Sequence, residues 1–296
     1  MFKGSIVAIV TPFKNGVVDE EKLRELVEFH VKNGTSGIVP CGTTGESPTL
    51  SHEEHDRVVQ VAVEAANKRI PVIAGTGSYN TEETVRMTVH AKKVGADGAL
   101  LVTPYYNKPT QEGLYRHFEK IAMEVDIPLV IYIIPGRTGV NVLPATVARL
   151  AKIDNVVGIK EASTSLDQVS EIISLCGDRL SILSGDDSLT LPIMAVGGRG
   201  VISVAANIIP KDVADMAGAF LAGDMEKARK LHYRMYPLFK ALFIETNPIP
   251  VKRAMELMGL CRGDLRLPLW PMSDENTSKL KKAMTDYGLL KSAAVR

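Results

Sequence analysis

The sequence of 296 residues has few cysteines, few aromatic residues and almost no net charge. Its three cysteines, Cys41, Cys176 and Cys261, lie far apart, which indicates free thiols in a reducing cytoplasm and gives no metal-site spacing. Lys and Arg number 35 against 34 Asp and Glu, so no surface for nucleic acid or acidic membranes is indicated. No apolar run approaches the roughly 20 residues that span a bilayer. These absences favour a cytoplasmic protein that binds neither nucleic acid nor membrane.

Two further signals are missing. The apolar start, MFKGSIVAIVTPF, is short and has no small-residue cleavage site, so we expect a first strand there and no signal peptide. The motif HEEH places His52 and His55 three positions apart, whereas the helix of a zinc protease needs four. We therefore expect no metal site.

What the sequence does contain is a regular alternation of strand and helix patterns. Apolar residues make up 45% and charged residues 23%, as in soluble globular proteins. Eight short β-like runs alternating with helical segments predict an α/β protein, a closed (β/α)8 or TIM barrel ending near residue 222. The runs are 5–13, 37–42, 71–77, 98–106, 128–135, 156–163, 180–187 and 200–207. A doubly wound open sheet is the alternative, which the count of eight and the missing Gly-rich fingerprint disfavour.

Helical spacing is clear in the segments between these runs, for example 20–33, 51–67, 81–94, 111–125 and 143–152. Ser51 and Glu54 form a capping box at the start of the second segment. From Asp224 onward the patterns are helical throughout, with faces rich in Met and Leu. We therefore divide the chain into a barrel, residues 1–222, and a C-terminal helical subdomain, residues 223–296.

The run VVGIKEAS places a lysine, Lys160, in a strand that is otherwise apolar or small. Alternation along a strand puts Gly158 and Ala162 on the face of Lys160, and Val157 and Ile159 on the other face. Burial lowers the pKa of a lysine, and the neutral amine attacks carbonyl groups to form a Schiff base. The alternative is that Lys160 extends past the strand end into water. A second feature must decide between them.

That second feature is the set of residues at the ends of the other predicted strands, where barrels of this kind hold their active sites. The turn CGTTGES offers backbone N–H groups and hydroxyls for an anion, although it is also an ordinary Gly-rich turn. Tyr132 shares a strand face with Val130 and Ile134, and Arg137 follows in PGRTG, suited to a carboxylate. Together, an amine, phenols, hydroxyls and an arginine indicate imine formation with a 2-oxo acid, followed by carbon–carbon bond chemistry through an enamine.

Six motifs occur in one order over about 200 residues: GTTGES, TPYYN, Y-x-x-PGRTG, GIKEAS, SGDD and GVISV. In this order they resemble the dihydrodipicolinate synthase family, one of the pyruvate-dependent class I aldolases and lyases, and NPIPVK (247–252) continues the resemblance. By that resemblance Lys160 is the Schiff-base residue for pyruvate and Tyr132 relays protons. Thr43 links Tyr132 to Tyr106, which in the family reaches in from a neighbouring subunit.

The resemblance also implies the remaining site residues and the reaction. Thr44, together with Thr43, would hold the pyruvate carboxylate, and Arg137 would bind the carboxylate of L-aspartate 4-semialdehyde. Gly185 and Ile202 match positions that line the site. The implied reaction condenses the two substrates to 4-hydroxy-tetrahydrodipicolinate, in lysine and diaminopimelate biosynthesis. It needs no metal or organic cofactor, and the family is commonly a tetramer built as a dimer of dimers.

Two departures from the family leave specific expectations. Ile133 replaces a usual asparagine after the strand-five tyrosine, and alternation directs it toward the helices, so we expect little effect on the chemistry. Some members bind L-lysine as a feedback inhibitor at a subunit interface, where this chain has Ser47, His52, His55, Glu83 and Tyr105. The asparagine position there is occupied by Tyr79, whose ring could fill the cavity. Inhibition by L-lysine is therefore left open.

Three other functions compete. N-acetylneuraminate lyases and 2-keto-3-deoxy sugar-acid aldolases share the lysine and tyrosine, but Arg137 suits a small carboxylated aldehyde better than a sugar. A non-catalytic pyruvate-binding barrel would not need Lys160, Tyr132, Thr43 and Tyr106 together. Cys41, beside the GTTGES turn, is expected to be a buried thiol with no reactive role.

Overall fold

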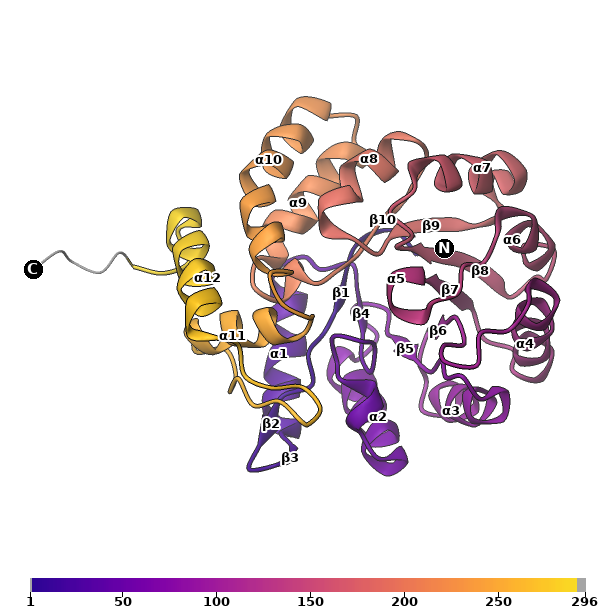
Figure 1. Ribbon diagram of the computed structural model, residues 1–296, viewed down its shortest axis with the longest axis horizontal. Helices are drawn as coiled ribbons and strands as arrows, with labels where there is room; N and C mark the ends of the chain where they lie inside the picture. The colour runs from indigo at the N-terminus through magenta and orange to yellow at the C-terminus, as the bar shows by residue number, and fades with distance from the viewer. Residues whose placement is uncertain (1, 292–296) are drawn as a thin grey trace, which may run out of the picture.

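The computed structural model describes residues 2–291, and its centre is a ring of eight parallel strands (Figure 1). Their order around the ring is β4-β1-β10-β9-β8-β7-β6-β5, and a bridge between Ile38 and Val72 brings its two ends together. The eight-stranded barrel is therefore confirmed. The strands are β1 (Gly4–Ala8), β4 (Gly37–Val39), β5 (Ile73–Gly75), β6 (Gly98–Val102), β7 (Leu129–Ile133), β8 (Val156–Glu161), β9 (Ser181–Ser184) and β10 (Gly200–Ser203), with a small hairpin of β2 (Phe13–Lys14) and β3 (Val17–Val18).

The helices surround this ring (Figure 1). The expected capping box at Ser51 is confirmed, since its side chain accepts from the Glu54 N–H and the Glu54 carboxylate accepts from the Ser51 N–H. Within residues 2–291, none of the helices combines the length and apolar content that a membrane span requires. They are α1 (Glu20–Lys32), α2 (His52–Ala66), α3 (Thr81–Lys93), α4 (Gln111–Glu124), α5 (Pro135–Thr138), α6 (Pro144–Leu150), α7 (Leu166–Cys176), α8 (Thr190–Ala195), α9 (Pro210–Leu221), α10 (Met225–Ala241), α11 (Ile249–Leu257) and α12 (Asp274–Tyr287).

After α9 the chain adds α10, α11 and α12, which lie together on one side of the barrel (Figure 1). Buried residues of these helices, including Met235, Val251 and Leu280, join the same apolar core as residues of β1, α1 and α2. We propose that residues 223–296 form the C-terminal helical subdomain. Residues 292–296 of this range lie outside the described part of the chain.

Alternation along the strands sorts side chains between the inside of the barrel and the layer under the helices. Val130, Tyr132 and Ile202 belong to the inner cluster, whereas Ile133 and Ile159 pack in the outer one, as the sequence predicted. Val157 was predicted to share the face of Ile159, and this is wrong. Leu129 of β7 pairs with Val156 of β8, but the next residue, Val130, pairs with Gly158, so Val157 has no partner in β7. This irregular pairing breaks the two-residue period of the strand, and Val157 packs against the inner cluster.

Candidate active site

Lys160 lies inside the barrel beside the phenol ring of Tyr132. The register of β7 and β8 pairs these two residues directly, and the Lys160 Nζ lies 4.0 Å from the ring centroid. Both residues are buried, since Lys160 is 6% exposed and Tyr132 is 5% exposed. The alternative of a solvated lysine is therefore wrong, since the stem stays inside the ring of strands.

Burial sets the protonation state of both groups. Desolvation lowers the pKa of Lys160 from 10.5 to about 7, assisted by the Arg137 charge and opposed by Asp187. Desolvation raises the pKa of Tyr132 to about 12, although Arg137 and a hydrogen bond with Thr43 act in the opposite direction. At neutral pH a large fraction of the amine is therefore unprotonated, while the phenol keeps its proton and can donate it.

Gly185, at the end of β9, leaves room for the lysine stem. A Cβ added at this glycine would lie 2.8 Å from the Ala162 Cβ and 3.2 Å from the Lys160 Cε. Gly158, which the sequence placed beside the same stem, serves a different purpose. Its added Cβ would meet the Ser181 carbonyl oxygen at 2.8 Å, so this glycine permits close packing of β8 on β9.

A buried carboxylate near Lys160 was not assigned a role from the sequence. Asp187 accepts hydrogen bonds from the N–H groups of Val204 (3.0 Å) and Ala205 (2.9 Å), and from the Ser203 hydroxyl. Burial nevertheless raises its pKa to about 6. It joins the end of β9 to the end of β10 and opposes the loss of the Lys160 proton. In the sequence, the only indication of Asp187 was its place as the second aspartate of the SGDD motif.

The GTTGES turn after β4 is fixed by the C-terminal subdomain. Lys252 of α11 donates to the Glu46 Oε1 in an ion pair whose two side chains are fully buried. The Arg266 N–H donates to the other Glu46 oxygen at 3.1 Å. Glu46 has a positive φ of 54°, and the Thr11 hydroxyl donates to the neighbouring Gly45 carbonyl at 2.6 Å. The glutamate of this motif therefore holds the turn in place and is not available as a catalytic base.

The same subdomain reaches two predicted substrate-binding residues through Asn247. The Asn247 Nδ2 donates to the Thr44 hydroxyl oxygen at 3.1 Å, and the Arg137 Nη2 donates to the Asn247 carbonyl oxygen at 3.0 Å. Arg137 is on α5, directly after β7. The sequence marked NPIPVK only as part of a family pattern, because these contacts join residues more than 100 positions apart.

A cavity of about 490 Å³ opens at this end of the barrel. Thr43, Tyr132 and Arg137 line it, together with all six residues predicted for the feedback site: Ser47, His52, His55, Tyr79, Glu83 and Tyr105. Within the described part of the chain, Lys160, Thr44, Gly185 and Ile202 are not among its lining residues, and neither is Tyr106. It is 90% exposed and has a positive φ of 62°.

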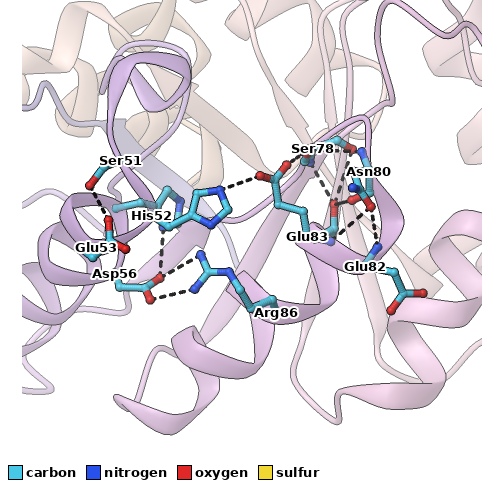
Figure 2. A network of polar contacts seen from close by, with 11 residues as sticks. Ser51, His52, Glu53, Asp56, Ser78, Asn80, Glu82, Glu83 and Arg86 are labelled. Atoms are coloured by element: carbon cyan, nitrogen blue, oxygen red, sulfur yellow. Dashed lines mark hydrogen bonds and ion pairs between the residues drawn. The ribbon is translucent and has the colours of Figure 1, made fainter.

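Figure 2 shows a polar network that includes His52, Ser78 and Glu83, three residues that line this cavity. Glu83 accepts from the Ser78 hydroxyl and contacts the His52 Nε2 at 2.8 Å. Asn80 caps α3, because its side-chain oxygen accepts hydrogen bonds from the N–H groups of Glu82 and Glu83 in the first turn of the helix. The Tyr79 and Tyr105 rings meet edge to face with centroids 5.1 Å apart.

Two of the side chains that line this cavity, those of His55 and Cys41, are buried. The His55 Nε2 contacts the Gly75 carbonyl oxygen at 2.8 Å, and burial lowers the pKa of its imidazole. Cys41 is buried, and burial raises the pKa of its thiol, which leaves it a weak nucleophile. Among residues 2–291, no three His, Cys, Asp or Glu side chains gather as a metal-ion site would require.

A buried lysine amine of lowered pKa beside a protonated phenol, at the carboxyl end of a (β/α)8 barrel, is the arrangement of an imine-forming aldolase or lyase. Comparisons with known proteins narrow this class. A model of the dihydrodipicolinate synthetase family matches residues 1–287. The chain belongs to this family, and it is an enzyme.

Individual relatives match this chain over almost its whole length. The chain is 63% identical to the 4-hydroxy-tetrahydrodipicolinate synthase of Citrifermentans bemidjiense, over 98% of this chain and 100% of that one. A crystal structure of dihydrodipicolinate synthase from Aquifex aeolicus is 56% identical with a TM-score of 0.96, covering 97% of this chain and 99% of that one. The chloride-inhibited synthase from Acinetobacter baumannii, crystallised with pyruvate, is 47% identical with a TM-score of 0.96, covering 98% and 100%.

Proposed function

We propose that the chain condenses pyruvate with L-aspartate 4-semialdehyde to 4-hydroxy-tetrahydrodipicolinate, the step that feeds lysine and diaminopimelate synthesis. The observation that carries the proposal is the desolvated Lys160 amine beside Tyr132. Full-length relatives named as this synthase support the choice of substrates.

In the proposed reaction the Lys160 amine attacks the keto carbon of pyruvate, and a water molecule leaves to give the imine. Loss of a proton from the methyl carbon gives an enamine, whose carbon attacks the aldehyde carbon. The amine of the semialdehyde then displaces Lys160 from the imine carbon and closes the ring. Tyr132 supplies and accepts protons through Thr43, and its high pKa keeps it a donor in the resting site.

Binding roles follow from charge and position. Thr43 and Thr44 would hold the pyruvate carboxylate, and Arg137 would take the carboxylate of the aldehyde, because a guanidinium matches that planar group. Gly185 leaves space for the Lys160 stem, and Ile202 contributes to the inner cluster beside Tyr132. No metal or organic cofactor enters the proposed steps.

We further propose that Tyr106 completes the proton relay of a neighbouring subunit, in a cytoplasmic tetramer built as a dimer of dimers. The 90% exposure of this tyrosine, at a backbone φ of 62°, supports a role outside its own cavity. Three buried free thiols support a reducing compartment. Sedimentation at several protein concentrations, with Tyr106→Phe assayed in the intact assembly, tests this assignment.

Borohydride reduction in the presence of pyruvate tests the imine. Mass mapping should find the label on Lys160, and Lys160→Ala should take up none. Label on a different lysine, or none in the wild-type protein, would refute the mechanism. Assaying the aldehyde against N-acetylneuraminate and 2-keto-3-deoxy sugar acids separates the sister activities, and absence of turnover with label present would identify a pyruvate-binding barrel.

The outer part of the cavity supports a second proposal, a regulatory site for L-lysine. Glu83 offers a carboxylate to an ammonium group, and His52 and Tyr105 also line the cavity. Tyr79 packs against Tyr105 in this region, so its ring reduces the room for the ligand. Titration of the condensation rate with L-lysine tests binding there.

A further inference from the structure

Asn247 lies in the segment between α10 and α11, and it contacts two of the three residues assigned to substrate carboxylates, Thr44 and Arg137. It is 5% exposed. Its side-chain Nδ2 donates to the Thr44 hydroxyl oxygen, whereas its main-chain carbonyl accepts from Arg137. One residue therefore touches the two binding groups through two different parts of its structure.

The contact with Thr44 constrains where that hydroxyl can direct its proton. A threonine hydroxyl has one proton to donate and two lone pairs that accept. The amide nitrogen of Asn247 is only a donor, so the Thr44 oxygen accepts on this side and its own proton remains for another acceptor. A carboxylate placed beside Thr44 would receive that proton in a charge-assisted hydrogen bond.

The surrounding contacts hold Asn247 firmly relative to the GTTGES turn. Lys252, five residues further on, donates to the buried Glu46 carboxylate of the same turn that carries Thr44. The Glu245 carboxylate, two residues before Asn247, accepts from the Asn276 side chain at 2.8 Å. The segment is thus fixed on both sides of Asn247, which limits the freedom of its amide.

We propose that Asn247 is a positioning residue that orients the Thr44 hydroxyl proton toward the pyruvate carboxylate. The proposal rests on the assignment of Thr44 to that carboxylate. It also makes a distinction between substrates. Replacing the Asn247 side chain removes only the contact with Thr44, because Arg137 is held by the main-chain carbonyl, which every variant retains.

The test compares Asn247→Ala and Asn247→Asp with wild-type protein. Two quantities are measured: the pyruvate concentration that gives half-maximal borohydride labelling of Lys160, and the KM values for pyruvate and for the aldehyde. Asn247→Ala should raise the half-labelling concentration and the pyruvate KM about fivefold, as for loss of the neutral amide–hydroxyl hydrogen bond that orients Thr44. Maximal labelling and the aldehyde KM should stay unchanged.

Asn247→Asp should raise the pyruvate KM further than Asn247→Ala. Its carboxylate accepts the Thr44 proton and adds a negative charge next to the bound carboxylate. This variant nearly keeps the shape of the side chain, so it decides the question if Asn247→Ala does not fold. Asn276→Ala is the matched control, because it removes one of the three hydrogen bonds to the Glu245 carboxylate and leaves the two from Ser273 and the contact with Thr44 in place, so its pyruvate KM should equal the wild-type value.

A double variant measures the coupling between the Asn247 side chain and the Thr44 hydroxyl. In a Thr44→Val background, Asn247→Ala should add no further change in half-labelling, because the hydroxyl it orients is gone. The proposal is overturned by an unchanged pyruvate KM in both Asn247 variants, by an equal rise in the KM of both substrates, or by additive effects in the double variant. Absence of label in the wild-type protein would instead refute the proposed function, so the two failures are distinguishable.

Discussion

Replacing Lys160 by methionine should abolish imine formation and at the same time stabilise the folded protein at neutral pH. In the unfolded chain this lysine keeps its proton up to its ordinary pKa of 10.5, whereas the folded protein releases it near 7. A shift of this size corresponds to about 5 kcal/mol, because one pKa unit is about 1.4 kcal/mol. Methionine has a similar length and no charge to desolvate, so the buried site no longer bears this cost.

The sign of the pH dependence follows from proton binding. Below pH 7 both states of the wild-type protein hold the proton, and folding bears the full cost. Between pH 7 and 10.5 the unfolded chain binds more protons than the folded one, so the wild-type free energy of unfolding rises with pH. The advantage of Lys160→Met should therefore be largest below pH 7 and shrink by about 1.4 kcal/mol per pH unit above it.

Urea unfolding of both proteins at pH 6, 7.5 and 9 measures this difference. Lys281→Met, at an exposed position of α12, is the control and should show no pH-dependent gain. The reasoning fails if Lys160→Met is no more stable than the wild-type protein at pH 6, or if its advantage is the same at pH 6 and pH 9. Either result would mean that the folded protein does not desolvate the Lys160 ammonium group.

Three further predictions concern single contacts. Gly185→Ala should slow pyruvate labelling of Lys160 about tenfold or more and also lower the Tm, because the added Cβ lies 3.2 Å from the Lys160 Cε and 2.8 Å from the Ala162 Cβ; wild-type labelling would contradict it. Lys252→Met should lower the free energy of unfolding, measured by urea titration, by about 3–5 kcal/mol, because the buried Glu46 carboxylate then has no cation paired with it. Adding Glu46→Gln to this variant should recover part of the lost stability, because the uncompensated charge is removed. Tyr79→Asn should reduce the concentration of L-lysine that halves the condensation rate, because it removes the ring packed on Tyr105, and an unchanged or higher concentration would argue against a lysine site there.

Local patterns were enough to predict the barrel. Strands and helices carry local periodicity, and α2 begins with a capping box, so β8 and α2 could be placed within a residue or two, and the alternation around Tyr132 was confirmed. The exception is Val157, where an irregular register between two strands changes the face of a side chain. Register depends on the partner strand, and the pattern of one strand alone does not contain it.

The residues that support the catalytic groups were much harder to predict, because their meaning depends on distant partners. Glu46 looked like part of an anion-binding turn, but its carboxylate is neutralised by Lys252, 206 positions away. Asn247 reaches Thr44 across 203 positions. Composition and spacing show that such polar residues exist, but not which of them will be buried against each other. The family resemblance named the groups proposed to touch substrates and left these supports unassigned.

These contacts change what the C-terminal subdomain does. From sequence it was an appended set of helices with a packing surface, yet Asn247, Lys252 and Arg266 all bind the segment that follows β4. Without them, Glu46 would lose its buried cation and Thr44 its amide donor. A buried carboxylate does not stay charged without a partner, so Glu46 would have to take up a proton or the turn would have to move to reach water. The barrel therefore provides Lys160 and Tyr132, and the subdomain fixes the turn that carries Thr43 and Thr44.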